Sequence, residues 1–137
     1  MSDCIFCKIA SGEIPSYTVY EDDQFRVIMD LSPVSPGHML ILPKGHYQDL
    51  YELPEELAAA AMRLAKRLAA AVQEALRPDG LNVMQNNGKA AGQTVMHYHL
   101  HLIPCYGDAG NFTLREGQSA TQEELEETAA KIQSQLA

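Results

Sequence analysis

The sequence predicts a single α+β domain in which one long helix packs against antiparallel strands. Runs of strand-forming residues lie on both sides of one long amphipathic segment, which is typical of this layer architecture. The chain has 137 residues, 46% of them hydrophobic and 20% charged, so it is long enough to bury a core without disulfides. This composition excludes a disordered or collagen-like chain.

The first part of the chain predicts a short helical segment and three strands. Residues 3–14 indicate a helical turn or a loop. An acidic turn at 21–23 joins two of the strands into a hairpin, and a loop with two prolines, 32–37, precedes the third. The predicted strands cover residues 17–20, 25–31 and 38–43.

Residues 54–77 predict the long helix. Pro54 suits the first helical position, Glu55 complements the positive end of the helix dipole, Arg77 lies at the negative end, and Pro78 ends the helix. Apolar residues recur every three or four positions and predict one buried face. They are Leu57, Ala61, Leu64, Leu68, Val72 and Leu76.

After this helix the sequence predicts two more strands and a final helix. Residues 81–87 indicate a strand that ends at Gly88, and 88–93 form a mobile loop of small residues before a long strand at 94–105. Beyond Gly107 the chain is polar until an acidic helix from Thr121 to about Leu136, with Thr121 as its cap.

Charge is distributed unevenly along the chain. The formal net charge is -8, yet the windows 31–48 and 80–107 contain no Asp or Glu, carry a net +2, and hold all five histidines. The remaining residues carry -10, which argues against binding to a nucleic-acid polymer. If the two windows lie together, they form a site that accepts an anion; the alternative is that they are simply buried strands.

The N-terminus lacks the basic and apolar regions of a signal peptide, and no apolar run approaches the roughly 20 residues that span a bilayer. We therefore expect a soluble, cytoplasmic protein with no membrane partner.

Three histidines alternate with apolar residues near the end of the second window. On a strand, His97, His99 and His101 would project from one face at about 6.6 Å spacing, and the face with Tyr98 and Leu100 would be core. A zinc hydrolase fits this row poorly, because its ends lie about 13 Å apart and no carboxylate is nearby. Nucleophilic catalysis by a neutral imidazole fits better, and the acid-free windows favour phosphoryl or nucleotidyl transfer.

Three segments of the sequence resemble the motifs of the histidine-triad (HIT) family. Residues 92–103 (GQTVMHYHLHLI) resemble its signature, residues 36–44 (PGHMLILPK) its second marker, and residues 4–9 (CIFCKI) the opening of bacterial Hint-like members. The resemblance implies a five-stranded antiparallel sheet with a short N-terminal helix, a long central helix and a C-terminal helix. It also implies a homodimer whose sheets join across the two-fold axis.

On this basis we expect one HIT domain over residues 1–137, with its core at about 4–105 and a C-terminal extension at 107–137.

The resemblance also implies the catalytic residues. His99 is the nucleophile that attacks the α-phosphorus of a nucleoside 5'-phosphoryl compound, and water then hydrolyses the nucleotidyl-histidine. His101 donates to the phosphate and His38 lines the site, while His97 orients its neighbours. Cys105 follows the Ile-Pro pair where many members have a basic residue, so a leaving-group contact from that position is not expected.

The implied substrate-binding residues divide between the nucleoside and the phosphate. Asp30 binds the ribose hydroxyls and Leu31 packs on the base; for Asp30, an exposed acid at a strand end is the alternative. The phosphate or leaving group is expected to lie near Asn86, Gly92, Gln93 and Thr94.

Cys4 and Cys7 supply two thiolates on one turn, which is half of a tetrahedral zinc site. Two free or buried cysteines are the alternative, and a redox pair is disfavoured because no βαβ pattern follows. His46 and His97 are the expected completing ligands. In the family, such a Cys2His2 zinc is structural, and no other cofactor is required for the chemistry.

These expectations predict a hydrolase or transferase that acts on purine nucleoside 5'-phosphoramidates, such as an adenosine 5'-monophosphoramidase. Two alternatives remain at this point. One is a dinucleoside polyphosphate hydrolase, because residues 92–95 also resemble the fragile-histidine-triad branch. The other is a nucleotide-binding scaffold protein with vestigial catalysis.

Overall fold

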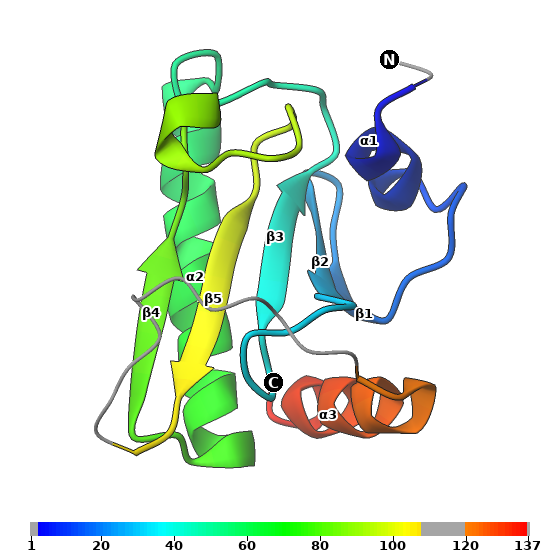
Figure 1. Ribbon diagram of the computed structural model, residues 1–137, viewed down its shortest axis with the longest axis vertical. Helices are drawn as coiled ribbons and strands as arrows, with labels where there is room; N and C mark the ends of the chain where they lie inside the picture. Colours follow the sequence, from blue (N-terminus) through cyan, green and yellow to red (C-terminus); the bar gives the residue numbers. More distant parts are fainter. Residues whose placement is uncertain (1–2, 108–119, 137) are drawn as a thin grey trace.

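The computed structural model describes residues 3–107 and 120–136. Within them, five strands form one antiparallel sheet with the order β1-β2-β3-β5-β4, which confirms the predicted α+β class (Figure 1). The strands are β1 (Thr18–Glu21), β2 (Phe25–Met29), β3 (Met39–Pro43), β4 (Gly80–Met84) and β5 (Leu100–Cys105). The helices are α1 (Ile5–Ala10), α2 (Glu55–Leu76), α3 (Gln122–Ser134) and a 3-10 turn, η1 (Lys89–Ala91).

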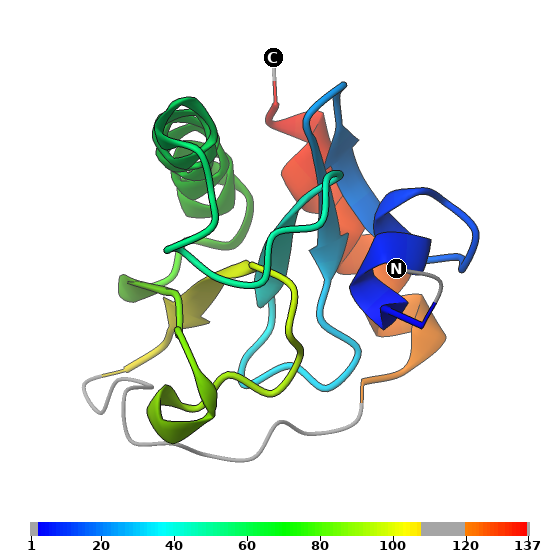
Figure 2. The same cartoon turned by 90° about the horizontal axis from the view of Figure 1, so that it is seen from above.

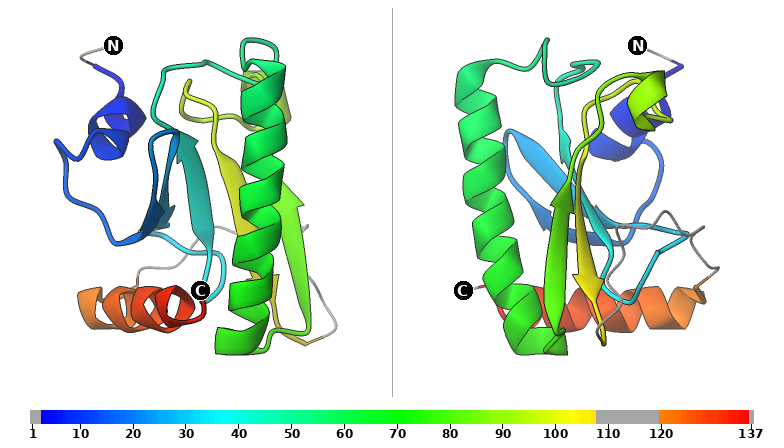
Figure 3. Two further views of the ribbon diagram at one scale, coloured as in Figure 1. Left: turned by 180° about the vertical axis from the view of Figure 1, so that it is seen from behind. Right: turned by 60° about the vertical axis from the view of Figure 1, so that its left-hand side comes forward.

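Helices cover both faces of the sheet, because its central strands alternate two sets of apolar residues. Val27 and Ile41 belong to the larger core, which α2 and α3 cover, whereas Ile28 and Leu40 face the other side and pack with Phe6 and Ile9 of α1. Seen from the side, α2 and α1 lie on opposite sides of the sheet (Figure 3). The histidine row lies on the side of α1.

The long helix α2 runs from Glu55 to Leu76, close to the predicted bounds. Pro54 is its N-cap rather than its first helical residue, and Arg77 closes it in a left-handed conformation with φ of 49°. Pro78 follows directly and cannot continue the helix. Its buried face, which packs against the sheet and α3, consists of Ala61, Leu64, Ala65, Leu68, Ala71 and Val72.

The C-terminal helix α3 belongs to the core of the domain. The Thr121 hydroxyl accepts a hydrogen bond from the Glu124 N–H at 3.1 Å, as the predicted cap requires. Leu125, Ala129 and Ile132 are buried in the larger core, where α3 packs against α2 and β1.

The long strand expected at 94–105 is wrong in its first half, because β5 begins only at Leu100. On one side β4 ends at this level, because its last residue, Met84, pairs with His101. On the other side β3 continues through Leu42 and Pro43, but its pairing with β5 stops where Ile41 pairs with Leu100. Residues 94–99 therefore have no ladder to join. They leave the sheet as a loop, in which the Tyr98 N–H donates to the Tyr47 carbonyl at 2.7 Å.

Candidate functional site

The histidines form a row along the sheet face that α1 partly covers, with the Phe6 ring in contact with both His97 and His99. Of the triad only His101 lies on a strand, so the predicted single-strand geometry is wrong, yet the rings still lie side by side. The ring centroids are 4.9 Å apart for His99 and His101 and 5.2 Å apart for His38 and His101. At the other end of the row, His46 and His97 are 5.1 Å apart. Loop residues before β5 thus extend the row beyond the sheet.

His99 is held in one orientation by the main chain. Its Nδ1 lies 2.7 Å from the carbonyl oxygen of His97, which can only accept a hydrogen bond, so Nδ1 carries the proton. In the neutral ring Nε2 is then left with a free lone pair. Burial lowers the pKa of His99 below its usual value, although the bond to His97 and the charge of Asp30 oppose this shift. His99 is therefore a neutral imidazole with one basic nitrogen.

His38 and His101 are joined directly. His38 Nε2 lies 2.9 Å from His101 Nδ1, and the Val34 N–H donates to His38 Nδ1 at 3.1 Å. Burial lowers the pKa of both rings, and for His101 the neighbouring histidines His99 and His38 add to this effect and bring its pKa to about 3. Both rings are neutral at pH 7.

Asp30 and Leu31 lie at the end of the row, just after β2. Asp30 Oδ1 accepts the Ser32 N–H at 2.8 Å, and Oδ2 lies 3.6 Å from His38 Nε2. Leu31 is 63% exposed, an unusual position for a large apolar side chain beside a carboxylate. This end of the site pairs an acceptor for hydroxyl groups with an open apolar surface.

The expected phosphate loop is more ordered than the sequence predicts, because it contains η1 and a buried anchor. Gln93 is buried; its Oε1 accepts the Gly88 N–H at 2.7 Å, and its Nε2 donates to the carbonyls of Gln48 and Val95. Gly92 has a φ of 95°, a backbone conformation that favours glycine. The Gln93 side chain thus braces the loop internally, while Thr94 is exposed.

The donor atoms of Cys4, Cys7, His46 and His97 all lie within 4.8 Å of one another. Cys7 Sγ is 3.2 Å from His46 Nδ1, and Cys4 Sγ is 3.4 Å from His97 Nδ1. His97 Nε2 lies 2.9 Å from the Pro43 carbonyl and must donate to it, which leaves Nδ1 unprotonated and facing the thiols. Burial and the adjacent Cys4 raise the pKa of the Cys7 thiol to about 11. Two sulfurs and two imidazole nitrogens around one point suit Zn²⁺.

Sequence reasoning missed Phe6, which lies between the two cysteines of the Cys4-x-x-Cys7 pair. Its ring stands edge-on to His99, with centroids 5.0 Å apart, and also to His97 at 6.1 Å. Phe6 therefore packs directly against the nucleophile candidate. The sequence signal for this contact was the aromatic residue between the two cysteines.

The top view shows how distant segments meet at this site. The N-terminal helix α1, the segment after β3 and the loop before β5 converge above the upper end of the sheet (Figure 2).

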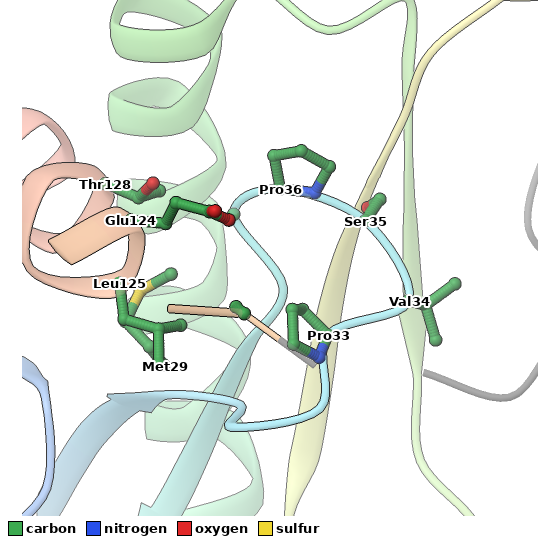
Figure 4. A pocket seen from close by; sticks show the side chains of 10 residues that line it. Met29, Pro33, Val34, Ser35, Pro36, Glu124, Leu125 and Thr128 are labelled. Atoms are coloured by element: carbon green, nitrogen blue, oxygen red, sulfur yellow. The ribbon is translucent and has the colours of Figure 1, made fainter. Parts of the chain in front are cut away.

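A different cavity, of about 150 Å³, lies between the loop at residues 33–37 and α3. Its lining includes Met29, Glu124 and Leu125 but no histidine (Figure 4). That cavity is separate from the histidine row.

Among the residues that the structure describes, no helix is both long enough and apolar enough to cross a membrane.

Comparison with known proteins gives a family match over most of the chain. Residues 11–108 match the HIT domain. The chain is 46% identical over 110 residues to Protein hit of Bacillus subtilis, covering 80% of this chain and 76% of that protein. It is 48% identical over 101 residues to an adenosine 5'-monophosphoramidase of Saccharomyces cerevisiae and 45% over 103 residues to an adenylylsulfatase of Arabidopsis thaliana. These matches cover 74% and 75% of this chain but only 61% and 52% of the two enzymes.

Solved structures give the same result over nearly the whole chain. A Hit-like protein from Bartonella henselae superposes with a TM-score of 0.88 at 36% identity, covering 99% of this chain and 98% of that one. A zinc-bound histidine triad protein from Mycobacterium smegmatis gives 0.86 at 37% identity, covering 98% and 94%. The histidine row, the sheet that carries it and these similarities lead to one conclusion: the chain belongs to the HIT family of nucleotide hydrolases.

Proposed function

We propose that the protein cleaves purine nucleoside 5'-phosphoramidates by transferring the nucleotidyl group to His99 and then to water. The observation that carries this proposal is the hydrogen bond from His99 Nδ1 to the His97 carbonyl, which leaves Nε2 as a free nucleophile on a neutral ring. The name of the yeast relative, an adenosine 5'-monophosphoramidase, supports this substrate class.

The reaction has two displacements at phosphorus. His99 Nε2 attacks the α-phosphorus, the P–N bond breaks, and the amine leaves with the electron pair and gains a proton. Water then attacks the same phosphorus and loses a proton, and the N–P bond to His99 breaks to release the nucleoside monophosphate. A nucleophile with a lowered pKa is unprotonated at pH 7, so neither step waits for its deprotonation.

The other histidines serve the nucleophile. His97 fixes the ring of His99 through its carbonyl oxygen. His101 donates a hydrogen bond to a phosphoryl oxygen, where negative charge grows during attack, and His38 lines the site behind it. Their low pKa values keep both rings neutral.

The nucleoside occupies the other end of the row. The Asp30 carboxylate accepts the ribose hydroxyls through lone pairs that remain beside the bond from the Ser32 N–H to Oδ1. The exposed side chain of Leu31 covers the base. Thr94 contacts the phosphate or leaving group, and Asn86, Gly92 and Gln93 shape the loop around it.

A structural zinc ion completes the N-terminal end of the site. Cys4, Cys7, His46 and His97 would hold it, and the zinc-bound relative from Mycobacterium smegmatis supports this assignment. When bound, the ion would cross-link α1, the segment after β3 and the loop that carries His97. It takes no part in bond breaking, which His99 and its neighbours perform.

We further propose that the protein acts as a homodimer joined through β4. This strand is an edge of the described sheet, and Val83 on it is 45% exposed. Beside it, an apolar groove is lined by Met62, Ala65 and Ala69 of α2. An open edge strand next to an apolar groove suits antiparallel pairing with a second copy.

The test is turnover of an adenosine 5'-phosphoramidate and mass-spectrometric detection of the nucleotidyl adduct. The adduct should map to the peptide that contains His99. His99→Gly should lower turnover at least about 10³-fold, whereas Tyr51→Ala, at a 90% exposed position, should leave it unchanged. Ordinary hydrolysis by purified His99→Gly would refute the nucleophile assignment. If diadenosine polyphosphates or adenylyl sulfate are cleaved faster than the phosphoramidate, they are the substrate class instead. Nucleotide binding without turnover would indicate a scaffold protein.

A further inference from the structure

We propose that the main-chain N–H of Val34 is a positioning group that sets the direction of two successive hydrogen bonds. It makes His38 the donor to His101 and leaves His101 with its proton on Nε2. The part of this inference that concerns phosphate rests on the proposed function; the order of the hydrogen bonds does not.

The first step follows from the chemistry of the Val34 amide. An amide N–H can only donate, and the Val34 nitrogen lies 3.1 Å from His38 Nδ1. His38 Nδ1 must therefore be the unprotonated nitrogen. In a neutral ring the single proton is then on Nε2, and the His38 side chain is buried deeply enough for this bond to be shielded from water.

The second step passes this choice to the next ring. His38 Nε2 lies 2.9 Å from His101 Nδ1, so the proton on His38 makes His101 Nδ1 the acceptor. The neutral His101 ring then carries its own proton on Nε2. With the opposite order, His101 would donate to His38, and the proton of His38 would move to Nδ1, where it would face the Val34 N–H. Two donors would then oppose each other at 3.1 Å.

Asp30 favours the same order. Its Oδ2 lies 3.6 Å from His38 Nε2, and a carboxylate oxygen stabilises a proton at that nitrogen. The side chains of Asp30, His38 and His101 converge as a metal site would, but a metal needs the lone pair of His38 Nε2, which the protonated nitrogen does not have. The three groups therefore act as a hydrogen-bonded chain rather than as metal ligands.

The loop that presents Val34 is anchored independently of the histidines. The Ser35 hydroxyl donates to the Pro104 carbonyl, and the Tyr106 hydroxyl donates to the Pro36 carbonyl at 2.9 Å. Gly37 has a φ of 94° and leaves no room for a side chain beside Leu76. The half-buried Val34 side chain points away from Leu125 and Glu124 of α3 (Figure 4). The amide is thus held by its neighbours.

The consequence for the substrate is that the nitrogen of His101 facing it is always a hydrogen-bond donor. His101 presents an N–H to the position of a phosphoryl oxygen without gaining a charge. His38 acts through its hydrogen bond to His101 and does not contact the substrate. Val34 and His38 are positioning residues in this scheme.

The test uses the full-length, zinc-loaded protein and imidazole ¹⁵N NMR, which reports which ring nitrogen carries the proton. In the wild-type protein, His38 and His101 should both be protonated on Nε2. Val34→Pro removes the N–H, whereas the matched control Val34→Ala keeps it. Val34→Pro should show a mixture of tautomers at both rings, and Val34→Ala should retain the wild-type pattern.

Kinetics supply the second measurement. On an adenosine 5'-phosphoramidate, kcat of Val34→Pro should be at least about tenfold below that of Val34→Ala, with a smaller change in KM, because a transition-state donor is lost. A proton on Nδ1 of His38 in the wild-type protein overturns the proposal even if Val34→Pro does not fold. Unchanged tautomers in a folded Val34→Pro protein overturn it as well. If the protein cleaves no phosphoramidate, the proposed function fails, and NMR still decides the order of the hydrogen bonds.

Discussion

His97 uses its ring and its main chain for two different neighbours. Its Nδ1 faces the thiols of Cys4 and Cys7, while its carbonyl oxygen accepts the proton of His99 Nδ1 at 2.7 Å. One residue therefore links the candidate zinc site to the candidate nucleophile. Anything that moves the His97 ring also moves the group that orients His99.

Cys7→Ser should remove the metal and weaken catalysis. We expect the zinc content, measured by elemental analysis without chelator, to fall well below one ion per chain. We also expect kcat to fall about tenfold or more, because His97 loses its anchor. Cys105→Ala is the matched control, since Cys105 is a buried cysteine on β5 outside the metal cluster. Equal zinc contents in the two variants would contradict the assignment of ligands.

Asp30→Asn should discriminate between sugars. Loss of the charged acceptor should raise KM for a ribonucleoside phosphoramidate about tenfold or more, as expected for hydrogen bonds to a charged group. The 2',3'-dideoxy analogue lacks the hydroxyls and should show a much smaller change. Steady-state kinetics on the two substrates make the comparison, and an equal rise in KM for both would disprove the ribose contact.

Acid should destabilise the fold through His101. Its folded-state pKa, about 3, lies below the unfolded value of 6.5. The unfolded chain therefore binds more protons between these values, so stability is full above pH 6.5 and falls as the pH drops. Between pH 7 and pH 5 this group should account for about 1–2 kcal/mol of the free energy of unfolding.

Urea denaturation of the wild-type protein and of His101→Asn at both pH values isolates this contribution. The variant should lose less stability on acidification, because it lacks the titrating ring. Identical losses in the two proteins would show that His101 is not buried in its neutral form.

Val83→Lys should give a monomer. A charge on the exposed face of β4 prevents an edge strand from pairing with a second copy. Analytical ultracentrifugation should show a dimer for the wild-type protein and a monomer for the variant, and Tyr51→Lys, at a 90% exposed position, should stay dimeric. A wild-type protein that sediments as a monomer at micromolar concentration would refute the dimer.

Local patterns in the sequence were sufficient for most of the fold. The apolar period of α2, the capping residue Thr121 and the runs of strand-forming residues in β2 and β3 each depend on neighbours in the chain. Each predicted an element close to its observed bounds. The beginning of β5 was not predictable in this way. It depends on where β4 ends and where β3 stops pairing with β5, and residues 94–99 have a strand-like alternation without strand partners.

The candidate site also divides into features that local sequence predicted and features that depend on distant segments. Histidine spacing and the cysteine pair indicated which residues meet, and the structure brings Cys4, Cys7, His46 and His97 together as expected. The internal role of Gln93 and the contact of Phe6 with His99 were not predicted, because both contacts depend on how the loops before β5 fold back over the sheet.

The burial of α3 sets a practical limit for shortened versions of this chain. The matched HIT domain stops at residue 108, yet Leu125, Ala129 and Ile132 are embedded among residues of α2 and the sheet. Truncation at that boundary would uncover an apolar surface on the side opposite the histidines and cost several kcal/mol, at about 1.5–3 kcal/mol for each large side chain. Such a fragment would be prone to aggregate, so labelled, tagged or crystallised versions should keep the chain through residue 136.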